Sequence, residues 1–139
     1  MRALVIDGSA ALGFLMPDEQ APGALAALDA LDDGVPAYVP AHWRIEVANG
    51  LLTAERRKRI SQAAASEALQ ALFSLPIEID EETARHVAGA IIGLARQYRL
   101  TVYDAAYLEL AMRRGATLAT GDAALAKAAK AAGVPTLQR

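Results

Sequence analysis

The stretch Leu4-Val5-Ile6-Asp7-Gly8-Ser9-Ala10 decides the fold, because a short aliphatic run ends abruptly at an acidic residue followed by a glycine. Residues 2–6 (RALVI) have the composition of a buried strand, and the three residues after them have that of a tight turn. In an open parallel sheet, ligands bind beyond the carboxyl ends of the strands, near the point where the strand order reverses. Asp7 is therefore the first candidate for a functional side chain.

Strand-like and helix-like segments alternate along the rest of the chain, with short connections. Further strands are expected at 35–39, 75–79, 117–120 and 134–137, and helices at 10–15, 20–31, 41–59, 61–73, 80–98, 101–114 and 122–132. This alternation predicts an α/β fold, with a mostly parallel sheet covered by helices on both faces. Neither a repeat nor a linker nor a low-complexity tract interrupts the sequence, so we expect a single domain over residues 1–139.

The composition limits the possible chemistry. The chain has no cysteine, which excludes disulfides, zinc–thiolate sites and a cysteine nucleophile, and with only His42 and His86 a zinc site is not expected. The apolar run at the start reaches Asp7 too soon for a signal-peptide core, and none of the apolar runs approaches the roughly 18–20 residues that a membrane span needs. We therefore expect a cytoplasmic protein that does not interact with a membrane.

The net charge is close to neutral, at −2, with 14 basic and 16 acidic residues. This balance argues against a protein that holds nucleic acid through a broad basic face. It leaves open a nuclease in which divalent cations neutralise both the site and the substrate phosphate. The candidate phosphate contacts are the arginines at positions 44, 96, 99, 113 and 114.

Three further acidic residues are candidates for a site with Asp7. Asp122 follows the expected strand 117–120, Asp104 lies near the start of the helix 101–114, and Glu46 lies in the middle of the helix 41–59. Taken singly, each has an ordinary explanation. Aspartate is a preferred residue at helix N-termini, and a glutamate within a helix is commonly solvated. Only the combination points to a function.

Four segments of the chain carry these acids within a shared pattern. They are LVIDGSA (4–10), HWRIEVANGLL (42–52), YDAAYLELA (103–111) and LATGDAAL (118–125). Together they resemble the signature segments of PIN-domain proteins, and more narrowly those of the VapC-type toxins of bacterial toxin–antitoxin pairs. The resemblance extends over essentially the whole chain, with Gly8 and Gly121 as small departures that remove no carboxylate.

The resemblance implies a three-layer α/β/α PIN-like domain whose five-stranded sheet has the order 3-2-1-4-5, with strands one and four side by side. It implies an acidic site, both catalytic and metal-binding, made of Asp7, Glu46, Asp104 and Asp122. It also implies supporting polar roles for Ser9, Asn49 and Thr120.

The same resemblance implies a metal-dependent endoribonuclease, with RNA as its substrate, a VapB-type antitoxin as its partner and a homodimer as its assembly. Clustered carboxylates repel one another unless a counter-charge is present, and Mg²⁺, or Mn²⁺ in its place, prefers such oxygen ligands. Asp7, Asp104 and Asp122 would hold the cation directly or through water. Glu46 would complete its shell or orient the attacking water.

The sequence leaves other interpretations open. The main alternative is a catalytically weak PIN-fold module that binds RNA or protein. A haloacid-dehalogenase-like phosphatase also begins with a strand and an aspartate, but its chemistry needs a second acid two residues later, where this chain has Ser9. A receiver domain needs paired acids at the first strand and a lysine after a late strand, neither of which is visible here.

Overall fold

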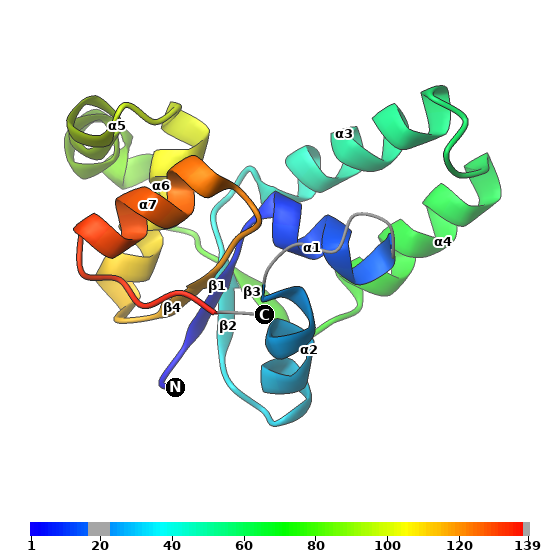
Figure 1. Cartoon of the computed structure of the whole chain (residues 1–139), viewed down its shortest axis with the longest axis horizontal. Coiled ribbons are helices and arrows are strands. Elements are labelled where there is room, and N and C mark those ends of the chain that lie inside the picture. Colours follow the sequence, from blue (N-terminus) through cyan, green and yellow to red (C-terminus); the bar gives the residue numbers. More distant parts are fainter. Residues whose placement is uncertain (17–22, 138–139) are drawn as a thin grey trace.

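In the computed structural model, which describes residues 1–16 and 23–137, four short strands form a parallel sheet with helices on both faces (Figure 1). The strands are β1 (Leu4–Ile6), β2 (Ala37–Val39), β3 (Ile77–Ile79) and β4 (Thr117–Ala119). Their order is β3-β2-β1-β4, and every neighbouring pair is parallel. The predicted α/β class and parallel sheet are confirmed.

The strand order reverses at β1. The chain first builds outward from β1 through β2 to β3, and then returns to place β4 on the free side of β1. The register pairs Ile6 with Ala119, and the backbone N–H of Asp7 donates to the carbonyl of Ala119 at 3.1 Å. The residues that follow β1 and β4 therefore lie side by side at one edge of the sheet.

The expected fifth strand at 134–137 is represented, among the described residues, by a single bridge. Thr136 pairs in parallel with Leu118, whose N–H donates to the carbonyl of Pro135 at 2.9 Å. A proline has no N–H to donate, so Pro135 cannot extend the ladder. The order 3-2-1-4 is thus confirmed, and the fifth position is occupied by a segment that pairs at one residue only.

Seven α-helices surround the sheet in the described part of the chain. They are α1 (Gly8–Leu15), α2 (Ala24–Asp32), α3 (Trp43–Arg56), α4 (Gln62–Phe73), α5 (Ile92–Tyr98), α6 (Val102–Arg114) and α7 (Ala123–Ala131). The helix expected at 20–31 begins at Ala24, and its first three expected residues lie outside the described ranges. Within those ranges no helix has the length and apolarity needed to cross a bilayer.

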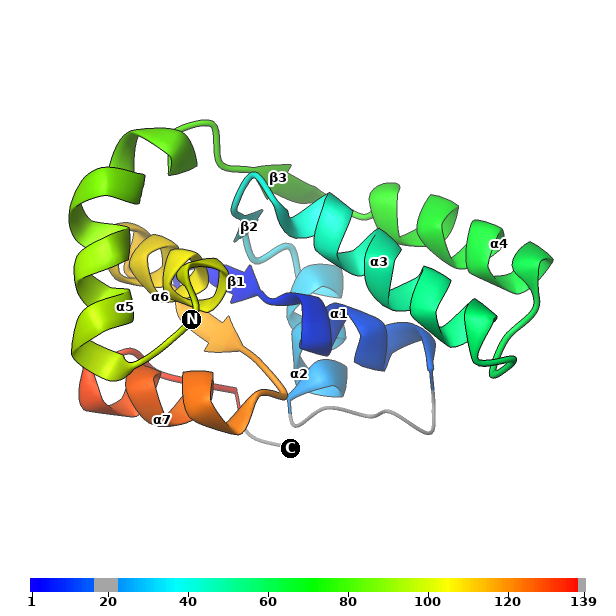
Figure 2. The ribbon, with the colours of Figure 1, turned by 90° about the horizontal axis from the view of Figure 1, so that it is seen from above.

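Two helix packings position the functional residues. Helix α6 contacts β1, β2 and β4, and its residues 105–111 are all buried, whereas α2 contacts β1 from the other face. Helices α3 and α4 run side by side as an antiparallel pair, and α1 packs against α3 (Figure 2). Each helix that carries a candidate acid therefore begins near the edge of the sheet where β1 and β4 end.

The segment expected as one helix over 80–98 is irregular in its first half, so this prediction is wrong in detail. Residues 81–82 form a turn, Thr83–His86 is a 3₁₀-helix, Val87–Ile91 is a π-helix, and only Ile92–Tyr98 is α-helical. The buried Asp80 carboxylate accepts from the Thr83 hydroxyl at 3.0 Å, which holds the turn closed. Glycines at 89 and 93 also weaken the regular α-helical geometry.

The core is mostly aliphatic, with two large aromatic side chains in it. Its largest side chains with almost no exposure include Trp43, Tyr107, Leu4, Ile6 and Leu118. Burying a side chain such as leucine or isoleucine contributes roughly 1.5–3 kcal/mol each. The strand residues before Asp7 are thus fixed firmly enough to orient it.

Candidate active site

Asp7 follows β1 directly and caps the N-terminus of α1. Its Oδ1 accepts from the backbone N–H of Ala10 and from the Ser9 hydroxyl, each at 2.8 Å, and its Oδ2 accepts from the Thr120 hydroxyl. The residue is only 3% exposed. The capping role and a site role are compatible here, because the same three donors hold the carboxylate in one orientation.

Ser9 and Thr120 also connect the loop after β4 to the start of α1. The Ser9 hydroxyl accepts from the N–H of Gly121 at 2.8 Å, and the Thr120 hydroxyl accepts from the N–H of Asp122 at 2.9 Å. Asp122 in turn caps α7, since its Oδ1 accepts from the N–H of Leu125 at 3.0 Å. Two of the three predicted supporting residues thus contact the Asp7 carboxylate directly.

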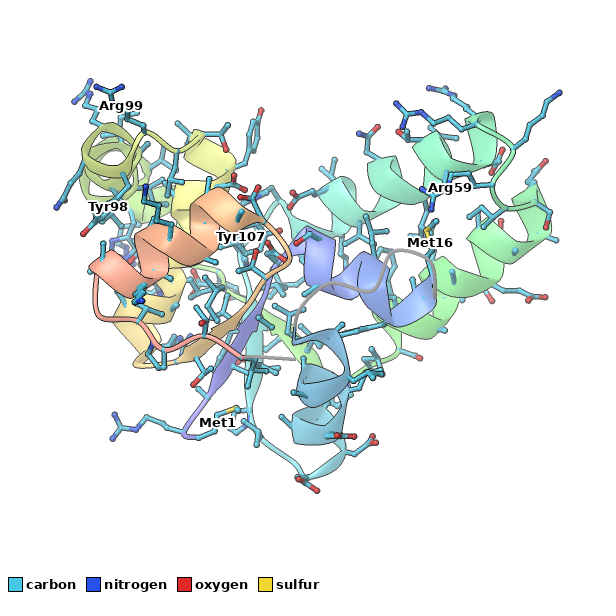
Figure 3. All side chains as sticks on the ribbon, in the orientation of Figure 1. Met1, Met16, Arg59, Tyr98, Arg99 and Tyr107 are labelled. Carbon is cyan, nitrogen blue, oxygen red and sulfur yellow. The ribbon has the colours of Figure 1, made fainter. Side chains whose placement is uncertain are left out.

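Glu46 reaches the same place from α3. The helix begins at Trp43, so Glu46 lies in its first turn and not mid-helix as expected. Its Oε1 accepts a hydrogen bond from the Tyr107 hydroxyl, and Figure 3 shows Tyr107 near the centre of the molecule. A Cβ on residue 8 would lie 2.8 Å from Cδ of Glu46, so the glycine at this position gives the Glu46 side chain its space.

Asp104 lies in the first turn of α6, whose N-cap is Thr101. The Thr101 hydroxyl accepts from the N–H of Asp104 at 3.1 Å. Asp104 and Tyr107 are three residues apart and therefore share one face of the helix. The helix brings a carboxylate and the phenol that binds Glu46 to the same side.

Burial and mutual repulsion both act on the acids. Burial raises the pKa of Asp7, and the three hydrogen bonds to its carboxylate oppose this rise. Burial likewise raises the pKa of Glu46, and repulsion from the charges of Asp7, Asp104 and Asp122 raises it further. The pKa of Asp104 is raised by burial and then by the charge of Asp122. The four predicted acids are therefore close enough to interact electrostatically, as the resemblance implied.

The carboxylate oxygens of these acids are suitable ligands for a hard divalent cation that keeps part of its water shell. All four acids offer oxygen ligands, and a bound cation would relieve both the burial and the mutual repulsion that raise the pKa of Asp7, Glu46 and Asp104. Among the described residues, however, no three histidine or acidic side chains are arranged as a complete metal site. Mg²⁺ keeps several waters and binds one or two carboxylates directly, so it does not require a complete protein cage.

A pocket of about 380 Å³ opens beside the acids. It is lined by His42, Ile45, Glu46, Asn49, Thr101, Tyr103 and Asp104. The third supporting residue, Asn49, is thus a pocket residue and not a partner of Asp7. The ring of His42 packs against two tyrosines, with centroids 5.6 Å from Tyr103 and 5.1 Å from Tyr107.

The five candidate arginines are not among the residues that line this pocket. Arg113 forms a two-point ion pair with Asp80, at 2.7 and 3.1 Å, and Arg114 also faces Asp80. Arg44 stacks on the ring of Phe73, with the guanidinium carbon 4.8 Å from the ring centroid. Arg96 and Arg99 are exposed on or just after α5, and Figure 3 shows Arg99 far from Tyr107.

The sequence alone indicated no role for Tyr107 or Gly8. Tyr107 binds Glu46, and Gly8 leaves space for its side chain. The spacing of Tyr107 from Asp104 was a usable signal, because residues three apart on a helix share a face. No comparable signal marks Gly8. Its importance arises from a residue 38 positions later in the sequence, which only the tertiary structure brings close.

A doubly wound parallel sheet with acidic side chains gathered at its reversal point defines a class of α/β domain with a polar site at one sheet edge. The family model described as "PIN domain" matches residues 4–131, and the chain belongs to the PIN-domain family. The chain is 32% identical to Ribonuclease VapC3 of Pyrobaculum aerophilum over 124 residues, which cover 89% of this chain and 92% of that one.

Solved structures share the fold at lower identity. PAE2754 of Pyrobaculum aerophilum has a TM-score of 0.70 at 23% identity, covering 97% of this chain and 83% of its own. VapC20 of Mycobacterium tuberculosis, described as a sarcin–ricin-loop-cleaving toxin, has a TM-score of 0.65 at 20% identity, covering 99% and 100%. FitAcB of Neisseria gonorrhoeae has a TM-score of 0.57 at 22% identity, covering 97% and 96%.

Proposed function

We propose that this protein is a metal-dependent endoribonuclease and the toxin of a type II toxin–antitoxin pair. The observation that carries the proposal is the gathering of four carboxylates, from the starts of four different helices, at one edge of the sheet. The similarity to a protein named Ribonuclease VapC3 supports RNA as the substrate. Membership of the PIN-domain family supports the same reading.

In this proposal Asp7, Asp104 and Asp122 would hold Mg²⁺ or Mn²⁺, directly or through its bound waters. When bound, the cation would supply Lewis acidity, which activates water and stabilises charge on the phosphate. Asp7 is held rigid by its three donors, so it would fix the position of the cation. Glu46 binds Tyr107 through Oε1, which leaves Oε2 to orient the attacking water and take its proton.

The test is cleavage of a generic RNA by the purified protein. We expect cleavage in Mg²⁺ or Mn²⁺, none in EDTA, and a loss of about 100-fold or more in Asp7→Asn. Asp29→Asn, which removes an exposed carboxylate from α2, is the matched control and should cleave normally. If RNA bound equally well without a divalent cation and was never cut, the protein would instead be the catalytically weak binding module.

The partners belong to the same proposal. A VapB-type antitoxin with a basic inhibitory segment would complement the acidic cluster, and FitAB, whose structure bound to a DNA fragment is known, is a structural neighbour at 21% identity with a TM-score of 0.60. The proposal also includes a homodimeric assembly and a cytoplasmic location. Co-purification with the product of a neighbouring gene, together with sedimentation of the free protein, would test the antitoxin and the dimer separately.

A further inference from the structure

The pocket beside the acids is bordered by unusually exposed apolar side chains. Tyr103 is 66% exposed and Ile45 is 76% exposed, and within the described part of the chain these are the two most exposed large hydrophobic residues. Single exposed apolar residues are common on protein surfaces, but here both line one pocket, from two different helices. The pocket therefore presents an aromatic face and an aliphatic face to solvent.

Polar groups lie in the same pocket. Asn49 is exposed there and carries both a donor and an acceptor on its amide. Nε2 of His42 is buried without a hydrogen-bond partner among the described residues, and it lies 3.9 Å from Oε1 of Glu46. A flat ligand with polar edges could thus make both stacking contacts and hydrogen bonds in this pocket.

The position of the pocket relates it to the proposed chemistry. Tyr103 immediately precedes Asp104, Ile45 immediately precedes Glu46, and both acids line the pocket themselves. A group that filled the pocket would therefore lie next to a phosphate held at the acidic cluster. In a nucleic acid, the group next to a phosphate that can fill such a pocket is the base of the adjoining nucleotide.

The charge distribution favours the same occupant. The five candidate arginines do not line the pocket, and the chain as a whole carries a net charge of −2. Apart from the cation proposed at the acids, affinity in this pocket must therefore come largely from uncharged contacts. Proteins recognise single-stranded RNA by stacking its splayed bases on aromatic side chains, and such stacking tolerates different bases.

We propose that this pocket receives one unstacked nucleobase of the RNA, next to the scissile phosphate. Tyr103 is its stacking platform, Ile45 covers it from α3, and Asn49 contacts its polar edge. The inference rests on the proposed ribonuclease function and extends it, because it assigns a binding subsite that selects an unpaired nucleotide at the cleavage point.

The first test compares variants of Tyr103 on a short RNA whose cleavage site has been mapped. Tyr103→Ala is expected to lower kcat/KM by about 10- to 100-fold, mostly through KM, and Tyr103→Phe to retain most of it, because the ring provides the stacking. Leu25→Ala, which removes an exposed apolar side chain from α2, is the control and should have no effect. Unchanged melting temperatures would show that the variants are folded.

The second test locates the base. An abasic nucleotide is placed at each position around the cleavage site in turn, and wild type and Tyr103→Ala are compared on each substrate. At the contacted position the two losses should not add, because both changes remove the same interaction. Losses that multiply at every position would overturn the proposal.

Binding gives a readout that does not depend on cleavage. In EDTA, 2-aminopurine at the contacted position should be quenched by wild type and not by Tyr103→Ala. A protein that quenches the base but never cuts would refute the ribonuclease function and keep the base pocket. If Tyr103→Ala cut and bound RNA normally but weakened self-association or antitoxin binding, the pocket would be a protein interface and the proposal would fall.

Discussion

Tyr107 and Gly8 both determine where the Glu46 carboxylate lies, although neither is charged. Tyr107 donates its hydroxyl hydrogen to Oε1 of Glu46, and Gly8 leaves open the space that the carboxylate carbon occupies. Burial and the neighbouring charge of Glu46 raise the pKa of the Tyr107 phenol well above its ordinary value, so it stays protonated and can act only as a donor to the carboxylate. The two residues give separate tests of how Glu46 is held.

Tyr107→Phe is expected to reduce RNA cleavage by about 10-fold, because Glu46 loses the donor that fixes it. The unfolding free energy should fall by only about 1 kcal/mol, because the aromatic ring stays buried and water can reach the partly exposed glutamate. Urea denaturation and cleavage rates measure the two effects. Tyr98→Phe, on α5, is the control, and equal activity of the two variants would show that the hydrogen bond does not matter.

Gly8→Ala is expected to displace the Glu46 carboxylate while leaving the fold intact. The added Cβ would meet the far end of a flexible side chain, which can move away at little cost. Cleavage should therefore drop by about 10- to 100-fold, while the unfolding free energy changes by no more than about 1 kcal/mol. Gly89→Ala, whose Cβ would meet nothing within 4 Å, serves as the control. Full activity in Gly8→Ala would contradict the positioning role.

Among the elements, α6 is tied at both ends to distant parts of the chain. Its start carries Asp104 into the acidic cluster, and near its end Arg113 binds Asp80 at the turn after β3. Arg113 also donates from Nε to Glu109 at 2.8 Å. The hydrogen bonds from Arg113 hold the pKa of Asp80 below its ordinary value of 3.8. This partly buried ion pair fixes the helix whose other end serves the site.

Asp80→Asn is expected to destabilise the protein by about 3 kcal/mol at pH 7, because Arg113 loses a buried partner. The pKa of Asp80 is lower in the folded state, so its contribution is fully present above the unfolded-state pKa and is lost as pH falls through the folded-state value. The difference between wild type and variant should therefore shrink below about pH 4.

Urea denaturation at pH 7 and at pH 3 checks this expectation. The matched control is Glu82→Gln, which removes an exposed pair with Arg85 and should cost less than about 1 kcal/mol. A difference between wild type and Asp80→Asn that stayed constant over the whole pH range would contradict a stabilising charge on Asp80.

Local patterns predicted the strands and most helices, because short apolar runs and helix caps are readable from neighbouring residues. The central residues of four strands were predicted correctly. The predicted strands also included Arg2 and Val35, which precede the first paired residues of β1 and β2. The segment 80–98 has the pattern of one helix, but Asp80, which closes the turn at its start, is held by Arg113, 33 residues away. The fifth strand was overestimated because Pro135 limits its pairing.

At the scale of the whole molecule, the topology of the sheet creates the site. The four acids are scattered from position 7 to position 122, and the return of the chain to the free side of β1 brings them together. The acids themselves could be predicted from the segments that carry them. Their partners Tyr107 and Gly8, and the pocket between α3 and α6, could not, because they depend on how the helices pack.

The proposal that these carboxylates together bind a hard divalent cation is tested most directly by calorimetric titration of Mn²⁺ into metal-free protein. We predict saturable binding to wild type, weaker by about 10-fold or more in Asp7→Asn and in Asp104→Asn, and unchanged in Asp29→Asn. Equal Mn²⁺ affinity in wild type and in both site variants would contradict the claim.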